Sequence, residues 1–381
     1  MQFAALRNLT VVCFASTLFA TTAAQTHFPK LTVAPLDELL DEMKFTIHAT
    51  KPDYVAFIPR VNDPNINDTG NEHFLVFDGP DGSLMAIWTQ STGEGNPDQH
   101  IVFAQSRDDG KTWSKTFLPH HDGTITQHAF ATLFERPNGG LGLVWLDGRL
   151  TVKDRDKGPM TLRYGAYDAQ WKQISDRGID TKVCDCCTTS VAMTADGPIA
   201  VYRNRTGDEI RDIYVSRYEM GAWTAGKPVH NDGWHVEACP VNGPVVSAHG
   251  KDVVVAWFVA KNDQGQSFTA FSNDSGRSFG NPIRLDDGSS LGKVDIEMLD
   301  DGSAVAAYIE FANQRAQFRM RHIERSGAKS APITIAGASG GRVGGVPRLA
   351  RSGNELVFEW VETPESGGVG IVKTATAALP H

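Results

Sequence analysis

Six segments of this 381-residue chain repeat one short pattern, and the repeat constrains the fold more than any other feature of the sequence. Each segment has a turn with glycine, followed by an apolar stretch that ends in an aromatic side chain. The closing aromatics are Trp88, Trp145, Tyr202, Trp257, Tyr308 and Trp360. They are spaced by 57, 57, 55, 51 and 52 residues, which fits one four-stranded antiparallel sheet per repeat.

Six such sheets can close into a ring whose radial packing protects the sheet edges. We therefore predict an all-β chain folded as a six-bladed β-propeller of four-stranded antiparallel blades. The expected blades cover about residues 70–120, 125–180, 185–230, 238–285, 292–335 and 345–380. The segment 45–58 is left over, and we expect it to supply a strand that closes the ring.

Two hairpins carry a second, finer motif. The stretch Ser106 to Trp113 matches the pattern S-x-D-x-G-x-T-W, and Ser272 to Phe279 matches it with conservative endings. Its aspartate can accept hydrogen bonds from turn amides, and its glycine allows a positive φ. With these motifs the chain resembles the sialidase-like Asp-box (BNR repeat) propellers, of the exported bacterial type, over nearly all of the sequence after residue 24. The resemblance implies that Asp108 and Asp274 are structural, because the boxes of this family lie away from the active face.

The first 24 residues have the features of an export signal. Arg7 supplies a positive charge, Leu9 to Ala20 is a short apolar run, and small residues precede Gln25. We expect a signal peptide over 1–24, a single propeller domain over 25–381, and a periplasmic or secreted protein that is monomeric. No later apolar stretch approaches the roughly 20 residues of a membrane span. The net charge of -9 argues against a nucleic-acid partner.

Four cysteines follow the expected signal, and three of them fall within four residues. They are Cys184, Cys186 and Cys187, with Cys239 further on. In the predicted blades, the start of the innermost strand and the end of the next strand lie on one face. The cysteines should therefore meet at the mouth of the central channel, from blades three and four, with His128 and His235 nearby.

Two interpretations of this cluster remain open. Thiolate and imidazole ligands suit copper and zinc, so the first is a metal site built from Cys184, Cys186, Cys187, Cys239, His235 and His128. A redox site with cysteines near Arg203 or His235 is closely related to it. In the second interpretation Cys239 forms a disulfide with one member of the cluster and joins two adjacent blades, because exported cysteines usually pair.

The resemblance to sialidases also raises glycoside hydrolysis. Sialidases need arginines for the substrate carboxylate, a tyrosine paired with a glutamate, and an aspartate acid. The candidate catalytic residues in this sequence are Arg149, Arg203, Arg348, Asp147 and Glu310. Tyr308 could pair with Glu310, but it occupies the aromatic position of the repeat, which favours core packing.

The leading hypothesis is an exported propeller that binds a soft metal or a redox-active ligand through its Cys/His cluster. One alternative is a glycoside hydrolase that acts on acidic sugars. Another is a disulfide-stapled propeller that binds a carbohydrate or a protein. Under each hypothesis a small-molecule, glycan or protein ligand is expected at the channel mouth.

Overall fold

The structure, a computed structural model, describes residues 32–35, 75–78, 83–91, 98–108, 111–136, 140–151, 158–168, 170–262, 264–338, 346–362 and 371–380. The expected signal peptide over 1–24 and the strand expected at 45–58 lie outside these residues. The described part is dominated by strands and has one short 3-10 helix, η1 (Arg149–Thr151). None of its helices is long and apolar enough to cross a membrane.

The described strands form six antiparallel sheets. The first three sheets, in chain order, consist of β2 (Leu75–Asp78), β3 (Leu84–Ser91) and β4 (Gln99–Ser106); of β5 (His128–Glu135), β6 (Leu141–Asp147), β7 (Thr161–Tyr167) and β8 (Gln173–Asp180); and of β9 (Ser190–Thr194), β10 (Gly197–Arg203), β11 (Ile213–Glu219), β12 (Ala222–Trp223) and β13 (Lys227–Pro228).

The other three sheets use the C-terminal half of the chain. They consist of β14 (Val245–His249), β15 (Asp252–Lys261), β16 (Gln264–Ser272) and β17 (Ile283–Arg284); of β18 (Ser290–Met298), β19 (Ala304–Ala312), β20 (Arg315–Ile323) and β21 (Ile333–Gly337); and of β22 (Arg348–Ser352), β23 (Glu355–Glu362), β24 (Ile371–Ala378) and β1 (Thr32–Pro35).

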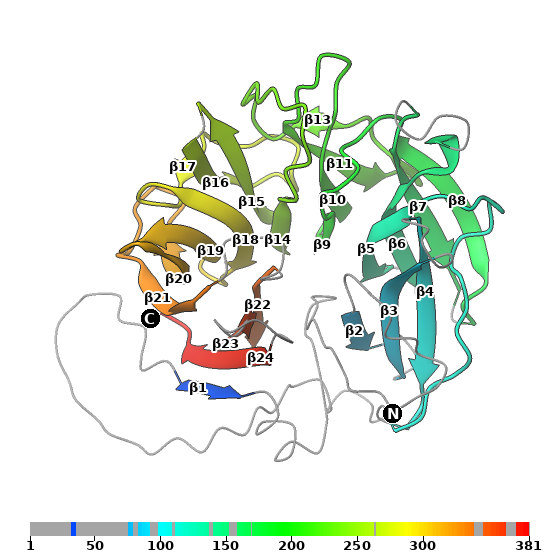
Figure 1. Ribbon diagram of the computed structural model, residues 1–381, viewed down its shortest axis with the longest axis horizontal. Helices are drawn as coiled ribbons and strands as arrows, with labels where there is room; N and C mark the ends of the chain where they lie inside the picture. The colour runs from blue at the N-terminus through cyan, green and yellow to red at the C-terminus, as the bar shows by residue number, and fades with distance from the viewer. Residues whose placement is uncertain are drawn as a thin grey trace.

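The last sheet contains both ends of the described chain. β1 pairs antiparallel with β24, so that Thr32 lies opposite Thr376 and Pro35 opposite Lys373. Figure 1 shows β1 at the edge of this sheet, beside β24. Within the described residues, the last sheet therefore gains its N-terminal strand from residues 32–35.

The sheets lie around a common centre, with their first strands innermost (Figure 1). Along the chain from the second sheet, each first strand contacts the next, as β5 contacts β9, β9 contacts β14, β14 contacts β18 and β18 contacts β22. Four of these strands line one central pocket: β9 and the residues before it through 188–190, β14 through 245–246, β18 through 295–297 and β22 through 348–349. The inner strands of four sheets therefore meet at this pocket.

The repeated aromatic occupies the same structural position in every sheet. All six side chains lie on the second strand of their sheets (β3, β6, β10, β15, β19 and β23), with exposures between 0% and 5%. Three of these rings donate a hydrogen bond to a carboxylate: Trp145 Nε1 to Asp147 and Trp257 Nε1 to Asp232, each at 2.8 Å, and Tyr202 Oη to Asp180 at 2.6 Å. The sequence repeat therefore reflects a repeated core position.

The turn glycine of the repeat has a conformational cause. Gly140, Gly197, Gly250, Gly302 and Gly353 all have positive φ, between 59° and 118°. A β-carbon on Gly140 would also lie 2.2 Å from the carbonyl oxygen of Tyr167. L side chains disfavour this backbone region, so glycine at the turn lets the first and second strands pair as a hairpin.

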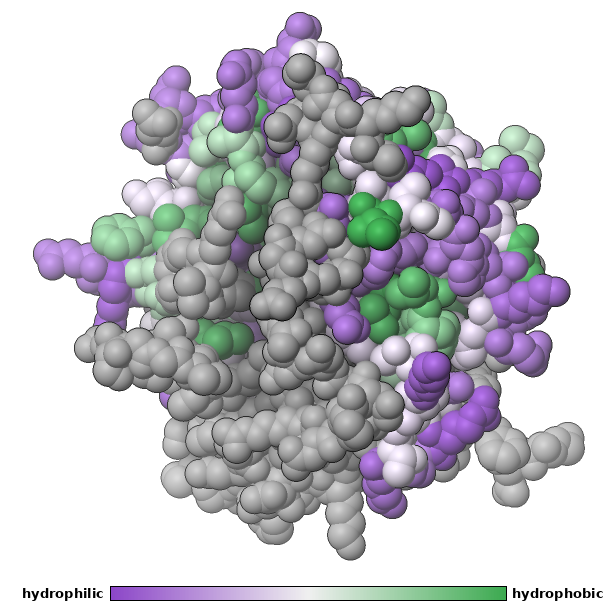
Figure 2. Space-filling view, turned by 45° about the vertical axis from the view of Figure 1, so that its right-hand side comes forward, coloured by the Kyte–Doolittle hydropathy of each residue, from purple (hydrophilic) through white to green (hydrophobic). Residues whose placement is uncertain are grey.

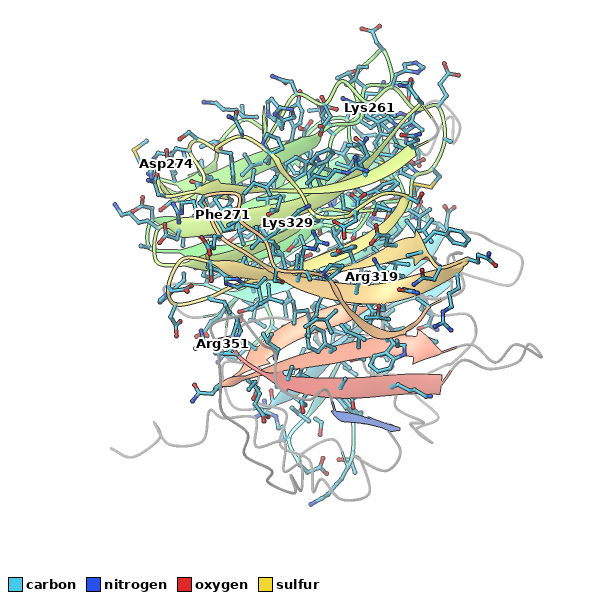
Figure 3. All side chains as sticks on the ribbon, turned by 90° about the vertical axis from the view of Figure 1, so that its left-hand side faces the viewer. Lys261, Phe271, Asp274, Arg319, Lys329 and Arg351 are labelled. Atoms are coloured by element: carbon cyan, nitrogen blue, oxygen red, sulfur yellow. A yellow bond between two sulfur atoms is a disulfide. The ribbon has the colours of Figure 1, made fainter. Side chains whose placement is uncertain are left out.

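Asp108 and Asp274 make equivalent contacts in two turns. Asp108 Oδ1 accepts hydrogen bonds from Ser106 Oγ (2.9 Å) and the Thr112 amide (2.8 Å). Asp274 Oδ1 accepts them from Ser272 Oγ (2.7 Å) and the Ser278 amide (3.0 Å). Figure 3 shows Asp274 at one end of the strands and Arg319 farther toward the other. Arg277 of the same turn bonds Asp196, which directly precedes β10, so the turn lies at the end where β10 begins.

The surface and the core differ in character. Figure 2 shows hydrophilic side chains over much of the described surface, with hydrophobic ones in separate small groups. The core consists of apolar clusters that span neighbouring sheets; one of them joins Val201 of β10 to Val255 and Trp257 of β15. Burial of apolar area between sheets is the main favourable contribution to folding in such an arrangement.

Candidate functional site

A sulfur cluster joins the third sheet to the fourth. Cys186 and Cys239 form a disulfide across a sequence separation of 53 residues. Cys186 belongs to the connection that leads into β9, and Cys239 to the connection that leads into β14. Cys239 therefore lies against the cluster, as predicted, and its bond to Cys186 is the kind of pairing that the second of the two interpretations described.

The other two cysteines are buried free thiols, with exposures of 1% for Cys184 and 2% for Cys187. Their Sγ atoms lie 3.4 Å apart, and Cys184 Sγ lies 3.8 Å from Cys186 Sγ. The hydrogen bond with Cys187, the Cys186 amide and the charges of Arg203 and Arg211 together outweigh burial and lower the pKa of Cys184 to about 6. Burial raises the pKa of Cys187, so Cys184 is the more acidic of the two thiols.

Two arginines supply positive charge to Cys184. Arg211 Nη1 donates to Cys184 Sγ at 3.4 Å, and its Nη2 donates to Glu209 at 2.8 Å. Arg203 is 1% exposed, and its guanidinium donates to the carbonyls of Arg211 (2.7 Å), Asn242 (2.8 Å) and Phe258 (2.8 Å). Because carbonyls carry no net charge, Arg203 keeps a buried positive charge, which lowers the pKa of Cys184.

The predicted histidines lie apart from the sulfur atoms. The His235 side chain is 58% exposed and lies 3.7 Å from Glu237. Within the described part of the chain, no converging set of ligand atoms combines a histidine with a cysteine, and His128 groups with other histidines and with aspartates. The expectation of one mixed Cys/His cluster is therefore not met, since His128 opens the second sheet and His235 faces solvent.

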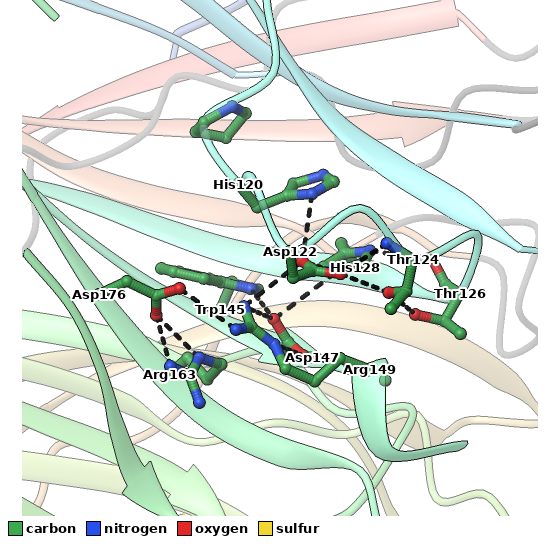
Figure 4. A network of polar contacts seen from close by, with 12 residues as sticks. His120, Asp122, Thr124, Thr126, His128, Trp145, Asp147, Arg149, Arg163 and Asp176 are labelled. Atoms are coloured by element: carbon green, nitrogen blue, oxygen red, sulfur yellow. Dashed lines mark hydrogen bonds and ion pairs between the residues drawn. The ribbon is translucent and has the colours of Figure 1, made fainter. Parts of the chain in front are cut away.

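His128 belongs to a buried polar network at the start of β5 and the end of β6 (Figure 4). Its Nδ1 lies 2.9 Å from the Thr126 carbonyl, and its Nε2 lies 2.8 Å from Asp122 Oδ2 and 3.6 Å from Asp147 Oδ2. Asp147 is fully buried, and Arg149 bonds both of its oxygens, at 2.7 Å and 2.8 Å. Burial would raise the pKa of Asp147, but the hydrogen bonds from Arg149 outweigh it and hold that pKa low.

Two further histidines, His100 and His120, complete this network. The His120 ring stacks on His128 with centroids 3.8 Å apart, and the His100 centroid lies 5.0 Å from that of His120. Burial, followed by the charges of His120 and His128, lowers the pKa of His100 to about 4. All three imidazoles approach one another although they come from β4, the following connection and β5.

Strand pairing explains the position of His100, and the contacts of a neighbouring residue explain that of His120. His100 lies opposite Gln90 in the β3–β4 ladder, so strand pairing places it at the same end of its sheet as the end of β3. His120 sits in a connection whose position is set by the adjacent Pro119 carbonyl. That carbonyl accepts hydrogen bonds from Tyr167 Oη (2.6 Å) and Gln173 Nε2 (3.3 Å).

The three candidate arginines occupy three different surroundings. Arg149 is bound to Asp147 and lies 3.2 Å from Asp176. Arg203 lies beneath the sulfur cluster, over the Trp234 ring at 4.8 Å. Arg348 lines the central pocket together with Asp295 and Glu297. Of these arginines, only Arg348 lies on the pocket that the inner strands form.

The remaining catalytic candidates are held by structural contacts. Glu310 is 2% exposed and accepts hydrogen bonds from Arg319 Nη1 (2.8 Å) and the Asp287 amide (2.9 Å). Tyr308 is fully buried, and burial raises the pKa of its hydroxyl. The complete burial of Tyr308 fits the core position that the repeat predicts for it.

Comparison with known proteins identifies the fold. No family model and no curated protein matches the chain. Among solved structures, a protein of unknown function from Dyadobacter fermentans aligns with a TM-score of 0.53 and 14% identity, over 80% of this chain and 93% of that one. A mutant of NanB sialidase from Streptococcus pneumoniae aligns with a TM-score of 0.54 and 9% identity, over 88% of this chain and 71% of that one. The chain therefore has a sialidase-like β-propeller fold.

Proposed function

We propose that this chain is an exported, six-bladed sialidase-like propeller that carries out thiol–disulfide exchange at its sulfur cluster. The observation that carries the proposal is the position of the Cys184 thiolate, 3.8 Å from Cys186 in the Cys186–Cys239 disulfide. The thiolate is the attacking species in such exchange, and nearby cations make it available at neutral pH. Exposure decreases inward, from exposed Cys239 through partly buried Cys186 to buried Cys184.

The first step is an internal exchange that needs no outside oxidant. Cys184 Sγ attacks Cys186 Sγ, the Cys186–Cys239 bond breaks, and a Cys184–Cys186 disulfide forms. The electron pair leaves on Cys239 Sγ, which takes a proton from solvent because Cys239 is exposed. The released Cys239 sulfur, after losing its proton again, can attack a disulfide of a partner protein, which forms a mixed disulfide with Cys239 and releases one partner sulfur as a thiolate that takes a proton from solvent.

The second internal step uses Cys187. Its sulfur lies 3.4 Å from Cys184, and after losing its proton it can attack Cys184 Sγ in the new disulfide. A Cys184–Cys187 disulfide forms, and Cys186 leaves as a thiolate that takes up the equivalent of the proton that Cys187 lost. The two steps together move the disulfide from the exposed pair, Cys186 and Cys239, to the buried pair.

Equilibration with glutathione buffers tests this proposal. The protein is poised at increasing fractions of reduced glutathione and quenched in acid, and its disulfide-linked peptides are identified by mass spectrometry. A disulfide that contains Cys184 should appear before all four cysteines are reduced. The Cys184→Ser variant should lack it, and Cys187→Ser should accumulate Cys184–Cys186. Reduction of Cys186–Cys239 in one step, identical in wild type and Cys184→Ser, would refute the proposal.

The same cluster is also proposed to bind copper or zinc when its disulfide is reduced. The Sγ atoms of Cys184, Cys186 and Cys187 lie within 4.8 Å of one another, and thiolates are preferred ligands of Cu(I) and Zn(II). Elemental analysis of reduced protein, compared with a Cys184→Ser and Cys187→Ser double variant, tests this. Equal metal content in the two proteins would exclude sulfur ligation.

Glycoside hydrolysis of acidic sugars is the second candidate function. It is favoured by the central pocket, where Arg348 lies with Asp295 and Glu297, and by the fold shared with NanB, a sialidase. A panel of fluorogenic sialosides and uronides tests it. Activity that Arg348→Ala abolishes and Cys184→Ser leaves intact would support hydrolysis, whereas inactivity on the whole panel would count against it.

A further inference from the structure

Three histidines converge where the first sheet meets the second, on different sheets from the sulfur cluster. His100 is the second residue of β4 (Gln99–Ser106), and His128 is the first residue of β5 (His128–Glu135). His120 lies in the connection between these strands. One ring nitrogen of each lies within 4.8 Å of the others.

These imidazoles are enclosed by protein. His128 is fully buried and His120 is 3% exposed, while His100 is partly exposed. The His120 and His128 rings are parallel within 2°. Two imidazolium ions stacked at this distance would repel each other, so the arrangement suits neutral rings with available lone pairs.

The hydrogen bonds leave ring nitrogens available as ligands. His100 Nδ1 and His120 Nε2 are buried and have no hydrogen-bond partner among the described residues. Buried polar atoms of this kind are rare, and each calls for an explanation such as a bound ion. A metal ion would accept the lone pairs of both nitrogens at once.

His128 has the pattern of an oriented metal ligand. Its Nδ1 lies 2.9 Å from the Thr126 carbonyl, which fixes the proton on Nδ1 and leaves the Nε2 lone pair free. That lone pair lies 2.8 Å from Asp122 Oδ2. Two acceptors at this separation require a cation or a proton between them.

We propose that His100, His120 and His128 bind a divalent transition metal ion, with Asp122 as the fourth ligand. Three imidazoles and one carboxylate suit Zn(II) and Cu(II) and disfavour Ca(II), which prefers oxygen ligands alone. Asp122 is held by the Thr124 amide at 2.9 Å and by Arg149 Nη2 at 3.4 Å. This site is independent of the exchange proposed for the sulfur cluster.

Metal titration tests the site with a matched control. Protein stripped with a chelator is titrated with ZnCl2 by calorimetry, with its disulfide intact. Wild type and a Cys184→Ser and Cys187→Ser double variant should each bind one equivalent. His120→Gln should weaken binding by at least about 100-fold, and Asp122→Asn by about 10- to 100-fold. His121→Gln, which changes an exposed neighbour, should bind like wild type.

X-ray absorption on zinc-loaded wild type gives a readout that does not depend on whether the variants fold. We expect nitrogen and oxygen scatterers at about 2.0–2.1 Å and no sulfur shell at about 2.3 Å. A sulfur shell would overturn the proposal, as would unchanged affinity in folded His120→Gln. The absence of a bound equivalent in wild type would show that a proton, rather than a metal, separates His128 from Asp122.

Discussion

Cys184 is the residue on which the proposed exchange depends, and its surroundings explain its charge. Its sulfur lies 3.4 Å from the sulfur of Cys187 and 3.4 Å from a guanidinium nitrogen of Arg211. Arg205 bonds the same carboxylate, Glu209, at 2.9 Å but has no sulfur contact in the described structure. Substitutions of Arg211 and of Arg205 both remove a hydrogen bond to Glu209, but only the first removes the cation beside the Cys184 thiol.

We predict that Arg211→Gln slows the release of Cys239 at pH 7 by about 3- to 10-fold, since loss of the cation returns the thiol toward its ordinary pKa. In wild type the rate should rise through about pH 6, the pKa of Cys184, and level off above it. In Arg211→Gln the rise should move to higher pH. The measurement is capture of Cys239 by maleimide, and equal profiles for Arg211→Gln and Arg205→Gln would contradict the assignment.

Glu359 provides a prediction about stability and pH. Burial raises its pKa to about 8, and the charge of Arg348 only partly opposes this. The folded pKa lies above the unfolded value, so the contribution to stability is complete below about pH 4.5 and is lost as pH rises toward 8. One proton corresponds to at most about 1.4 kcal/mol per pH unit.

In Glu359→Gln this slope should disappear from the free energy of unfolding between pH 5 and 8, as measured by urea denaturation. Glu355→Gln, on the same strand β23 and less buried, should keep the slope of wild type. Parallel curves for wild type and Glu359→Gln would show that Glu359 does not titrate as its burial requires.

At the scale of the strands, much of the fold could be predicted from the sequence. The aromatic positions from Trp88 to Trp360 fall on the second strand of all six sheets, because a turn glycine and an apolar strand leave a pattern that survives in a single sequence. The pairing of β1 with β24 could not be predicted. It depends on a short segment far from its partner in the chain.

The sites were less predictable for two physical reasons. Three clustered cysteines could each pair with Cys239, and only the folded connections decide that Cys186 does so. His120, with a second histidine beside it, has the sequence pattern of a solvated loop. It is buried because Tyr167 and Gln173 bond the preceding carbonyl and fix the connection against β7 and β8.

The turn around Asp274 gives a prediction at this same scale. Asp274→Ala removes hydrogen bonds from Ser272, Arg277 and Ser278 and should lower the free energy of unfolding by on the order of 1–3 kcal/mol. Asp252→Ala breaks a half-exposed ion pair with Arg325 and should cost less than about 1 kcal/mol. Neither variant should alter the release of Cys239; a large change in Asp274→Ala would show that this turn affects the sulfur cluster.

At the scale of the whole molecule, the disulfide connects two sheets that also share a core cluster. It closes a loop of 53 residues, so Cys239→Ser should lower the free energy of unfolding by on the order of 2–4 kcal/mol. The difference from wild type should vanish in excess reductant. If it persists there, the serine itself and not the lost bond is responsible.

The sulfur cluster, the histidine cluster and Glu310 all lie where first strands begin and second strands end. Cys184 bonds the carbonyl of Arg203, the last residue of β10, and His128 lies opposite Asp147, the last residue of β6. The chemistry-bearing groups therefore gather at one end of the sheets, and the Asp274 turn lies at the other. Substitutions in the Asp274 turn should therefore change the stability of the fold without changing the reactivity of the cysteines.

Maleimide capture without any reductant tests the central claim most directly. Protein with its native disulfide is incubated with maleimide, and the modified and disulfide-linked peptides are mapped by mass spectrometry. Because Cys184 and Cys187 are buried, the reagent should capture exposed Cys239 as the internal exchange releases it. In Cys187→Ser, modified Cys239 should appear together with a Cys184–Cys186 disulfide, and in Cys184→Ser the Cys186–Cys239 bond should remain intact. Equal modification of Cys239 in the two variants, or none in either, would contradict the exchange.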